Sequence, residues 1–387
     1  MIIGIPKEIL PEERRVAALP ETVTKYVELG FQVLVETAAG NGVFRRDVEY
    51  VAAGAEIAPS AQTLYERADV VLKVKQPCYN ESLGRHEAEL LREGAILITF
   101  LHPAAPSNHD MIRMLRDRKI TAFTMDGIPR TSRAQTMDAL TSMSTVTGYK
   151  SLLIAASHFP RFVPMIGTAI GAIRPAEILV VGAGVVGLQA IATAKRLGGS
   201  AKAVDIRGDA RREAGSLKGT KVVGFEVPDE LAVGDGGYAQ ALPDQWLQRE
   251  RDLLHTLAPK MDIIILSALV PGELAPILIT EEMVRDMRPG SVIVDVSIDQ
   301  GGNCALTQAG REIVVHDVYV CGTANIPGSV AVDASWLYAT NMLHYVENLF
   351  AQGPGQLNLD DEIVQHSLVT RDGSIVHKGA LKAMGTV

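Results

Sequence analysis

The sequence is poor in cysteine, in aromatic residues and in long apolar runs. Its 387 residues include only three cysteines, too few for a disulfide framework, so we expect reduced thiols. The most apolar stretch, residues 162–173, is interrupted by a proline and two glycines, whereas a membrane-spanning helix needs about 20 apolar residues. The first residues carry charge and lack the apolar core of a secretion signal. We therefore expect a soluble, cytoplasmic protein.

Positive charge is also in short supply, since 37 Lys and Arg stand against 45 Asp and Glu, a net charge of −8. A protein that follows nucleic-acid phosphates needs a basic face, so no nucleic-acid partner is expected. The cysteines are not spaced with histidines as zinc ligands, so no metal site is expected. Glycine is abundant, with 35 residues, and it concentrates where chains turn tightly or approach ligands.

Short apolar runs alternate with amphipathic segments along most of the chain, which favours an α/β fold with parallel sheets. We expect helices at 20–29, 109–118 and 336–350, and a mostly helical, buried segment over 141–172. The pattern predicts two Rossmann-like domains with an interdomain cleft: a discontinuous domain of residues 1–144 plus 328–387, and a cofactor domain of 145–327. The expected strands are 2–5, 32–36, 70–74, 95–101, 121–125, 177–181, 201–206, 262–267, 291–296 and 318–322.

A dinucleotide fingerprint occupies residues 182–187, where Gly182, Gly184 and Gly187 follow an expected strand and open an expected helix. The first glycine permits the tight turn, the second admits the pyrophosphate beside Val185 and Val186, and the third lets helix and strand pack closely. Asp205 ends the next strand, where a carboxylate accepts hydrogen bonds from ribose hydroxyls and repels a 2′-phosphate. NAD is therefore the predicted cofactor, although nearby Arg207 tempers the preference.

Longer motifs resemble the family that joins alanine dehydrogenases to the α subunit of proton-translocating transhydrogenase. They cover essentially the whole chain and include IPKE at 5–8, ERRVA at 13–17, SRAQTMDAL at 132–140, the stretch around the fingerprint at 173–198, ALVPGELAPILIT at 268–280, MRPGSVIVDV at 287–296 and GGNC at 301–304.

Over its length the chain looks most like the soluble NAD(H)-binding α subunit of transhydrogenase. That resemblance implies a loop of Arg130, Gln135 and Asp138 that contacts nicotinamide, and a mobile loop with Tyr238 in the motif GDGGYA. It also implies membrane and NADP-binding partner subunits, and a homo-oligomer that is most simply a dimer.

The chemically active positions are instead similar to alanine dehydrogenase. The contexts ERRVA, VLKVKQP and FLHPAA contain Arg15, Lys75 and His102, and VDVSIDQGGN and GTANIPG contain Asp299 and Asn325. This resemblance implies that Arg15 and Lys75 bind a substrate carboxylate and carbonyl, that His102 is the general acid/base, and that Asp299 and Asn325 shape the site. It also places Ser144 and Ala268 at the cofactor.

Two hypotheses follow. The first is an NAD(H)-dependent oxidoreductase for an amino-acid/oxo-acid or imino-acid pair, in which Arg15 holds the carboxylate, Lys75 polarises the oxo or imino group and His102 moves the proton. The alternative is the transhydrogenase subunit, which passes hydride to NADP on a partner. A bland interpretation also stands for each residue: Lys75 as an edge charge, His102 as a loop histidine, Asp299 as a cap and Asn325 as a turn former.

Overall fold

The computed structural model describes residues 1–234, 239–270 and 274–385. The predicted loop residue Tyr238 lies outside these ranges. The chain divides into two compact units, Met1–Met143 with Pro327–Val387, and Ser144–Ile326, one residue before each predicted boundary. The roles predicted for them, substrate side and cofactor side, stay predictions. Within the described ranges, no helix is both long and apolar enough to cross a membrane.

The first unit is built on an eight-stranded sheet of order β19-β18-β8-β7-β4-β1-β2-β3, in which the strands from β8 to β3 run parallel. The chain passes from β1 to β2 and β3 on one side, and then builds β4, β7 and β8 on the other. Such a change of direction opens a crevice at the carboxyl ends of β1 and β4, where ligands bind in open α/β sheets. The strands are β1 (Ile2–Ile5), β2 (Gln32–Glu36), β3 (Glu56–Ala58), β4 (Val70–Leu72), β7 (Ile96–Thr99), β8 (Thr121–Thr124), β18 (Leu368–Arg371) and β19 (Ser374–Ile375), beside a small β5 (Tyr79–Asn80) and β6 (Arg85–His86) pair.

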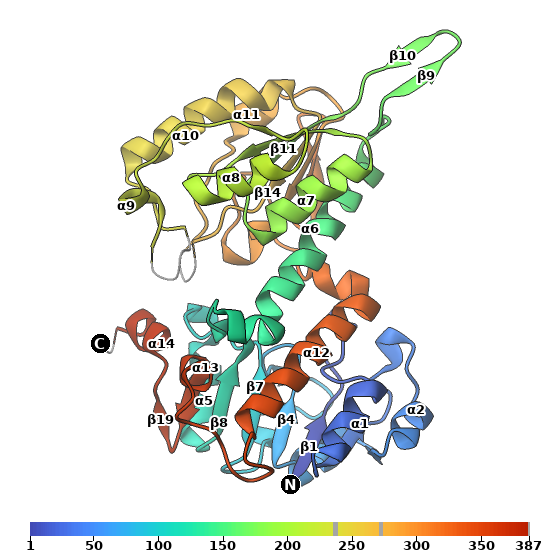
Figure 1. Cartoon of the computed structure of the whole chain (residues 1–387), viewed down its shortest axis with the longest axis vertical. Helices are drawn as coiled ribbons and strands as arrows, with labels where there is room; N and C mark the ends of the chain where they lie inside the picture. The colour runs from blue at the N-terminus through green and yellow to red at the C-terminus, as the bar shows by residue number, and fades with distance from the viewer. Residues whose placement is uncertain (235–238, 271–273, 386–387) are drawn as a thin grey trace. The chain divides into compact units, whose positions relative to one another are not determined.

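Helices cover both faces of this sheet, so its central strands are apolar on both sides. One core joins α3 and α5 to the strands, and α12 and α1 cover the near face in Figure 1. The helices are α1 (Pro20–Glu28), α2 (Asp47–Ala52), α3 (Ala61–Arg67), α4 (Glu87–Leu90), α5 (His109–Asp117), α12 (Ala331–Leu349), α13 (Glu362–Ser367) and α14 (Lys378–Ala383).

The second unit has a seven-stranded sheet of order β13-β12-β11-β14-β15-β17-β16, which is the dinucleotide-binding order with one antiparallel edge strand, β16. Helices α7 and α8 pack on one face, and α10 and α11 on the other. Its strands are β11 (Glu177–Val181), β12 (Ser200–Val204), β13 (Lys221–Val222), β14 (Ile263–Leu266), β15 (Val292–Asp295), β16 (Glu312–Val315) and β17 (Val318–Cys321). Its helices are α6 (Ala139–His158), which contains the unit boundary, α7 (Val185–Arg196), α8 (Gly208–Ser216), α9 (Asp229–Ala232), α10 (Asp244–Leu257) and α11 (Glu281–Asp286). The α/β class and the Rossmann-like sheets are confirmed.

The expectation of a buried helical segment over 141–172 is wrong in its second half. Helix α6 ends at His158, and β9 (Ile166–Thr168) and β10 (Gly171–Ile173) form an antiparallel hairpin that projects from the second unit (Figure 1). Pro160 and Pro164 cannot continue a helix, and Gly171 has a φ of +136° that suits glycine. The hairpin's apolar side chains are exposed, with Ile170 at 100%.

Candidate functional site

The glycine-rich turn of the second unit joins β11 to α7. Gly182 has a φ of +88°, and a Cβ there would lie 2.6 Å from the Ser267 carbonyl oxygen. A Cβ on Gly187 would lie 1.9 Å from the Gly182 carbonyl oxygen, so helix and strand touch through backbone. At Gly184 a Cβ would meet only the Arg207 guanidinium, at 3.7 Å. The turn is thus closed at its first and third glycines and open at its second, ahead of Val185, where α7 begins, which fits a pyrophosphate.

Asp205 follows β12 and is only 7% exposed. One carboxylate oxygen accepts the Ala183 N–H at 2.7 Å, and the other accepts the Arg207 N–H at 2.8 Å. The Arg207 guanidinium also donates to Asp205, at 3.1 Å. Asp205 therefore shapes the glycine turn and holds Arg207 beside it, a structural role that the sequence did not predict. Its contact with ribose stays a prediction.

Loops after β14 and β15 are tied together by Asn303. Its side chain accepts the Ala268 N–H at 3.0 Å and donates to the Ala268 carbonyl at 2.9 Å. Buried Asp295 accepts the backbone N–H groups of Asn303 and Cys304 at 2.8 and 2.9 Å. Burial raises the pKa of the Asp295 carboxyl, and these hydrogen bonds oppose the rise. The network fixes Ala268 and the 3₁₀ turn Val296–Gln300, on which Asp299 is exposed.

In the first unit, Arg15 is 3% exposed and its guanidinium is already engaged. Its Nε and Nη2 donate to the Glu13 carboxylate at 2.8 and 2.5 Å, and its Nη1 lies 3.0 Å from the Met143 sulfur. Burial alone would raise the pKa of Glu13, but Arg15, with help from Lys75, holds it below the ordinary value. Lys75 therefore lies within electrostatic reach of the Glu13–Arg15 pair.

The backbone that leads from β4 to Lys75 is held at successive residues. The Val74 N–H donates to the buried Glu8 carboxylate at 2.6 Å, the Tyr338 hydroxyl donates to the Lys73 carbonyl at 2.8 Å, and the Thr99 hydroxyl donates to the Lys75 carbonyl at 2.9 Å. Lys75 itself is half-buried. Its main chain thus has little freedom at the mouth of the crevice.

His102 follows β7 with a φ of +46°, in the left-handed region that a non-glycine residue rarely adopts. Its backbone N–H donates to Asp126 at 3.1 Å, its Nδ1 lies 3.6 Å from the same carboxylate, and its ring stacks on Phe100 with centroids 5.7 Å apart. Asn325, in the second unit, also has a positive φ, +53°, and is half-buried. Such strained positions cluster at functional sites.

The predicted nicotinamide loop contains the 3₁₀ helix Ser132–Met137, with Arg130 and Gln135 exposed. Asp138 accepts the Thr141 N–H and hydroxyl at 2.8 and 2.6 Å and so caps α6, which is a structural role. Ser144 lies one turn further along α6 and is half-buried. The loop is braced by an ion pair between Arg133 and Asp361 at 2.6 Å.

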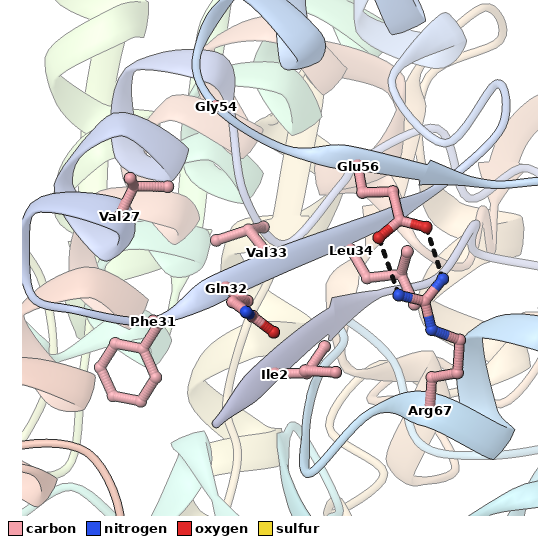
Figure 2. Close-up of a pocket in the computed structure, with 9 residues that line it drawn as sticks. All are labelled: Ile2, Val27, Phe31, Gln32, Val33, Leu34, Gly54, Glu56 and Arg67. Atoms are coloured by element: carbon pink, nitrogen blue, oxygen red, sulfur yellow. Dashed lines mark hydrogen bonds and ion pairs between the residues drawn. The ribbon is translucent and has the colours of Figure 1, made fainter.

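The largest hollow does not coincide with these residues. It measures about 420 Å³ and lies at the amino ends of β1 and β2, against Ile2 and Gln32 (Figure 2). Its charged groups, Glu56 and Arg67, bind each other at 2.5 and 2.7 Å. A smaller hollow of about 100 Å³ touches Glu8, Glu13 and Arg15. We favour the smaller one because ligands bind at the carboxyl ends of parallel strands.

Each unit therefore gathers its own predicted residues at the carboxyl edge of its sheet. Arg15, Lys75 and His102 share the first edge, and the glycine turn, Asp205, Ala268, Asp299 and Asn325 share the second. The sequence patterns did not single out Glu13, Asp126, Asn303 or Glu250. Of these, Asp126 could have been found, because it follows an expected strand just as His102 does. Among the described residues, no cluster of His, Cys, Asp or Glu could hold a metal ion.

The fold and the glycine turn define an NAD(H)-binding oxidoreductase of the Rossmann type. More specifically, the chain belongs to the alanine dehydrogenase/PNT family: residues 4–147 match the N-terminal domain of that family and residues 151–378 match its C-terminal domain. Members of the family bind NAD(H), so the predicted cofactor is confirmed at this level.

Both branches of the family are represented among similar proteins. An NAD(P) transhydrogenase alpha subunit of Rhodospirillum rubrum is 44% identical over 97% of this chain and 98% of its own length. An alanine dehydrogenase of Methanococcus maripaludis is 32% identical, over 99% and 96%. Among solved structures, the transhydrogenase from Sinorhizobium meliloti matches with a TM-score of 0.84 and 38% identity, over 97% of this chain and all of that one. An L-alanine dehydrogenase matches with 0.82 and 29%, over 100% and 99%.

Proposed function

We propose that the chain is an NAD(H)-binding transhydrogenase subunit that passes hydride to NADP on a partner subunit. The end-to-end similarity to the Rhodospirillum rubrum transhydrogenase alpha subunit, at 44% identity over nearly the whole of both chains, carries the proposal. Amino-acid oxidoreduction, which the sequence patterns placed first, becomes the second candidate, because the alanine dehydrogenase relative is only 32% identical.

For hydride transfer, NAD(H) supplies the reacting nicotinamide when it is bound. The chain's own contribution is to hold and orient that cofactor. The N–H groups that follow Gly184 at the start of α7 face the pyrophosphate, and Asp205 meets the ribose. Exposed Arg130 and Gln135, with Ser144 and Ala268, orient the nicotinamide end. Membrane and NADP-binding subunits are the proposed partners, and a homodimer is the proposed assembly of the chain itself.

The second candidate rests on the first unit's carboxyl edge, where Lys75 and His102 follow neighbouring strands β4 and β7. In this function, Lys75 donates to the substrate's oxo or imino group, and His102, steadied by Asp126, takes or returns the proton. Arg15 adds positive charge for the carboxylate. Transhydrogenation protonates no small substrate, so these groups have no task in it.

The two functions separate in one set of assays. Purified chain is mixed with NAD and a panel of amino acids, and separately with transhydrogenase partner subunits, NADH and an NADP analogue. Exchange between the nucleotides with a silent amino-acid panel supports the proposal. NADH formation from an amino acid by the chain alone, lost in His102→Asn while NADH binding persists, supports the second candidate instead. Asparagine is chosen because it tolerates the left-handed backbone at residue 102.

A further inference from the structure

Glu250 on α10 is 5% exposed, and among the described residues no hydrogen bond or ion pair reaches its carboxyl group. Every other buried acid in the described ranges accepts at least one hydrogen bond. Those residues are Glu8, Glu13, Glu87, Asp205, Asp262 and Asp295. A buried carboxyl group without a partner is costly, so its retention calls for a reason beyond folding.

The position of Glu250 supplies that reason. One turn further along α10, Leu254 packs in the same core as Val204, the last residue of β12, and Leu266, the last of β14. Asp205 comes next after β12, at the end where the adenosine of a dinucleotide lies. Burial and the negative charge of Asp205 raise the pKa of Glu250 to about 7, and Arg251 opposes them. The two acids therefore interact at the adenosine end.

We propose that Glu250 is a second acidic residue of the adenosine subsite and that, together with Asp205, it selects NAD(H) against NADP(H). The 2′-phosphate of NADP(H) would bring additional negative charge toward Asp205. Arg207 lies there but is already paired with Asp205, at 3.1 Å. An ionised Glu250 behind that pair tips the balance against the phosphate, whereas the neutral 2′-hydroxyl of NAD(H) is little affected.

The charged groups around the subsite come from several elements. Asp205 and Arg207 follow β12, and Arg211 on α8 donates to the Asp205 and Phe225 carbonyl oxygens at 3.3 and 3.0 Å. Asp209 and Glu213 on α8 act on Arg207, and Arg251 acts on Glu250 from its own helix. Because the arginines stay charged, a change of selectivity near neutral pH reports on Glu250.

The test is to measure dissociation constants for NADH and NADPH by nucleotide fluorescence, from pH 6 to pH 8.5. Wild type is compared with Glu250→Gln, and with Asp252→Asn as a control at an exposed acid on the same helix. At pH 8 we expect Glu250→Gln to bind NADPH about tenfold more tightly than wild type, with NADH affinity changed less than about twofold. At pH 6 the difference shrinks, because wild-type Glu250 is then protonated. The phosphate's own titration is common to all variants.

An NADPH-to-NADH affinity ratio that is the same in wild type and Glu250→Gln at pH 8 overturns the inference. Should the glutamine variant not fold, Glu250→Met gives the same readout with an apolar side chain. The inference rests on NAD(H) binding but not on the proposed hydride acceptor. A wild-type chain that binds neither nucleotide overturns the cofactor assignment and the inference together, whereas an unchanged ratio overturns the inference alone.

Discussion

Glu13 and Arg15 form a buried ion pair in which both carboxylate oxygens are used, at 2.8 Å from Nε and 2.5 Å from Nη2. The arginine predicted to hold a substrate carboxylate thus already has a carboxylate of the protein's own. Excess positive charge at the first carboxyl edge comes from Lys75, which lies close enough to lower the pKa of Glu13. An anionic substrate would therefore depend on Lys75 more than the sequence motif suggests.

Glu13→Gln should destabilise the fold by about 3 kcal/mol, because it leaves the buried Arg15 cation without a counter-charge. Denaturant unfolding followed by circular dichroism measures the change. Glu28→Gln is the matched control, since Glu28 pairs with Lys25 at the surface, and it should cost less than about 1 kcal/mol. Equal effects at the two positions would contradict a buried, tightly held pair.

A second buried network lies beneath the crevice, where Lys73 stands between Glu8 at 3.4 Å and Glu87 at 2.9 Å. Lys73→Met should destabilise the protein by about 3–5 kcal/mol, because two carboxylates then face each other without a cation. Adding Glu87→Gln should recover some of this loss. The surface variant Lys25→Met is the control, and thermal unfolding of the series provides the measurement. A Lys73→Met protein as stable as the wild type would argue against a charged cluster.

Much of the fold could be predicted from the sequence, because apolar runs such as 2–5 and 177–181 are bounded by turn residues and match the observed strands. The glycine turn was readable because each glycine answers a local backbone requirement. Residues whose role depends on distant partners were not. Glu13 and Glu250 look like ordinary surface acids until folding buries them, and the hairpin of β9 and β10 resembles a helix because its residues are apolar although they are exposed.

The three glycines of the turn should separate folding from cofactor binding. Gly184→Ala should leave the unfolding free energy within about 0.5 kcal/mol, because residue 184 has a φ of −73° and space around it, yet weaken NADH binding at least about tenfold by obstructing the pyrophosphate. Gly187→Ala should instead destabilise the unit itself by about 1–3 kcal/mol, since its Cβ would overlap the Gly182 carbonyl. Fluorescence titration with NADH and denaturant unfolding distinguish the two. Normal NADH affinity in folded Gly184→Ala would place the pyrophosphate elsewhere.

Glu250 should also make folding stability depend on pH in a defined direction. Its pKa is about 7 in the folded chain against an ordinary 4.5, so the folded state holds a proton that the unfolded state releases between these values. Stability contributed by that proton is complete below pH 4.5 and is lost as pH rises to 7, amounting to about 2–3 kcal/mol. Glu250→Gln cannot titrate, so its stability relative to wild type should increase by that amount between pH 5 and pH 8. Urea unfolding at both pH values tests this, and a pH-independent difference between the two proteins would show that Glu250 is ionised throughout.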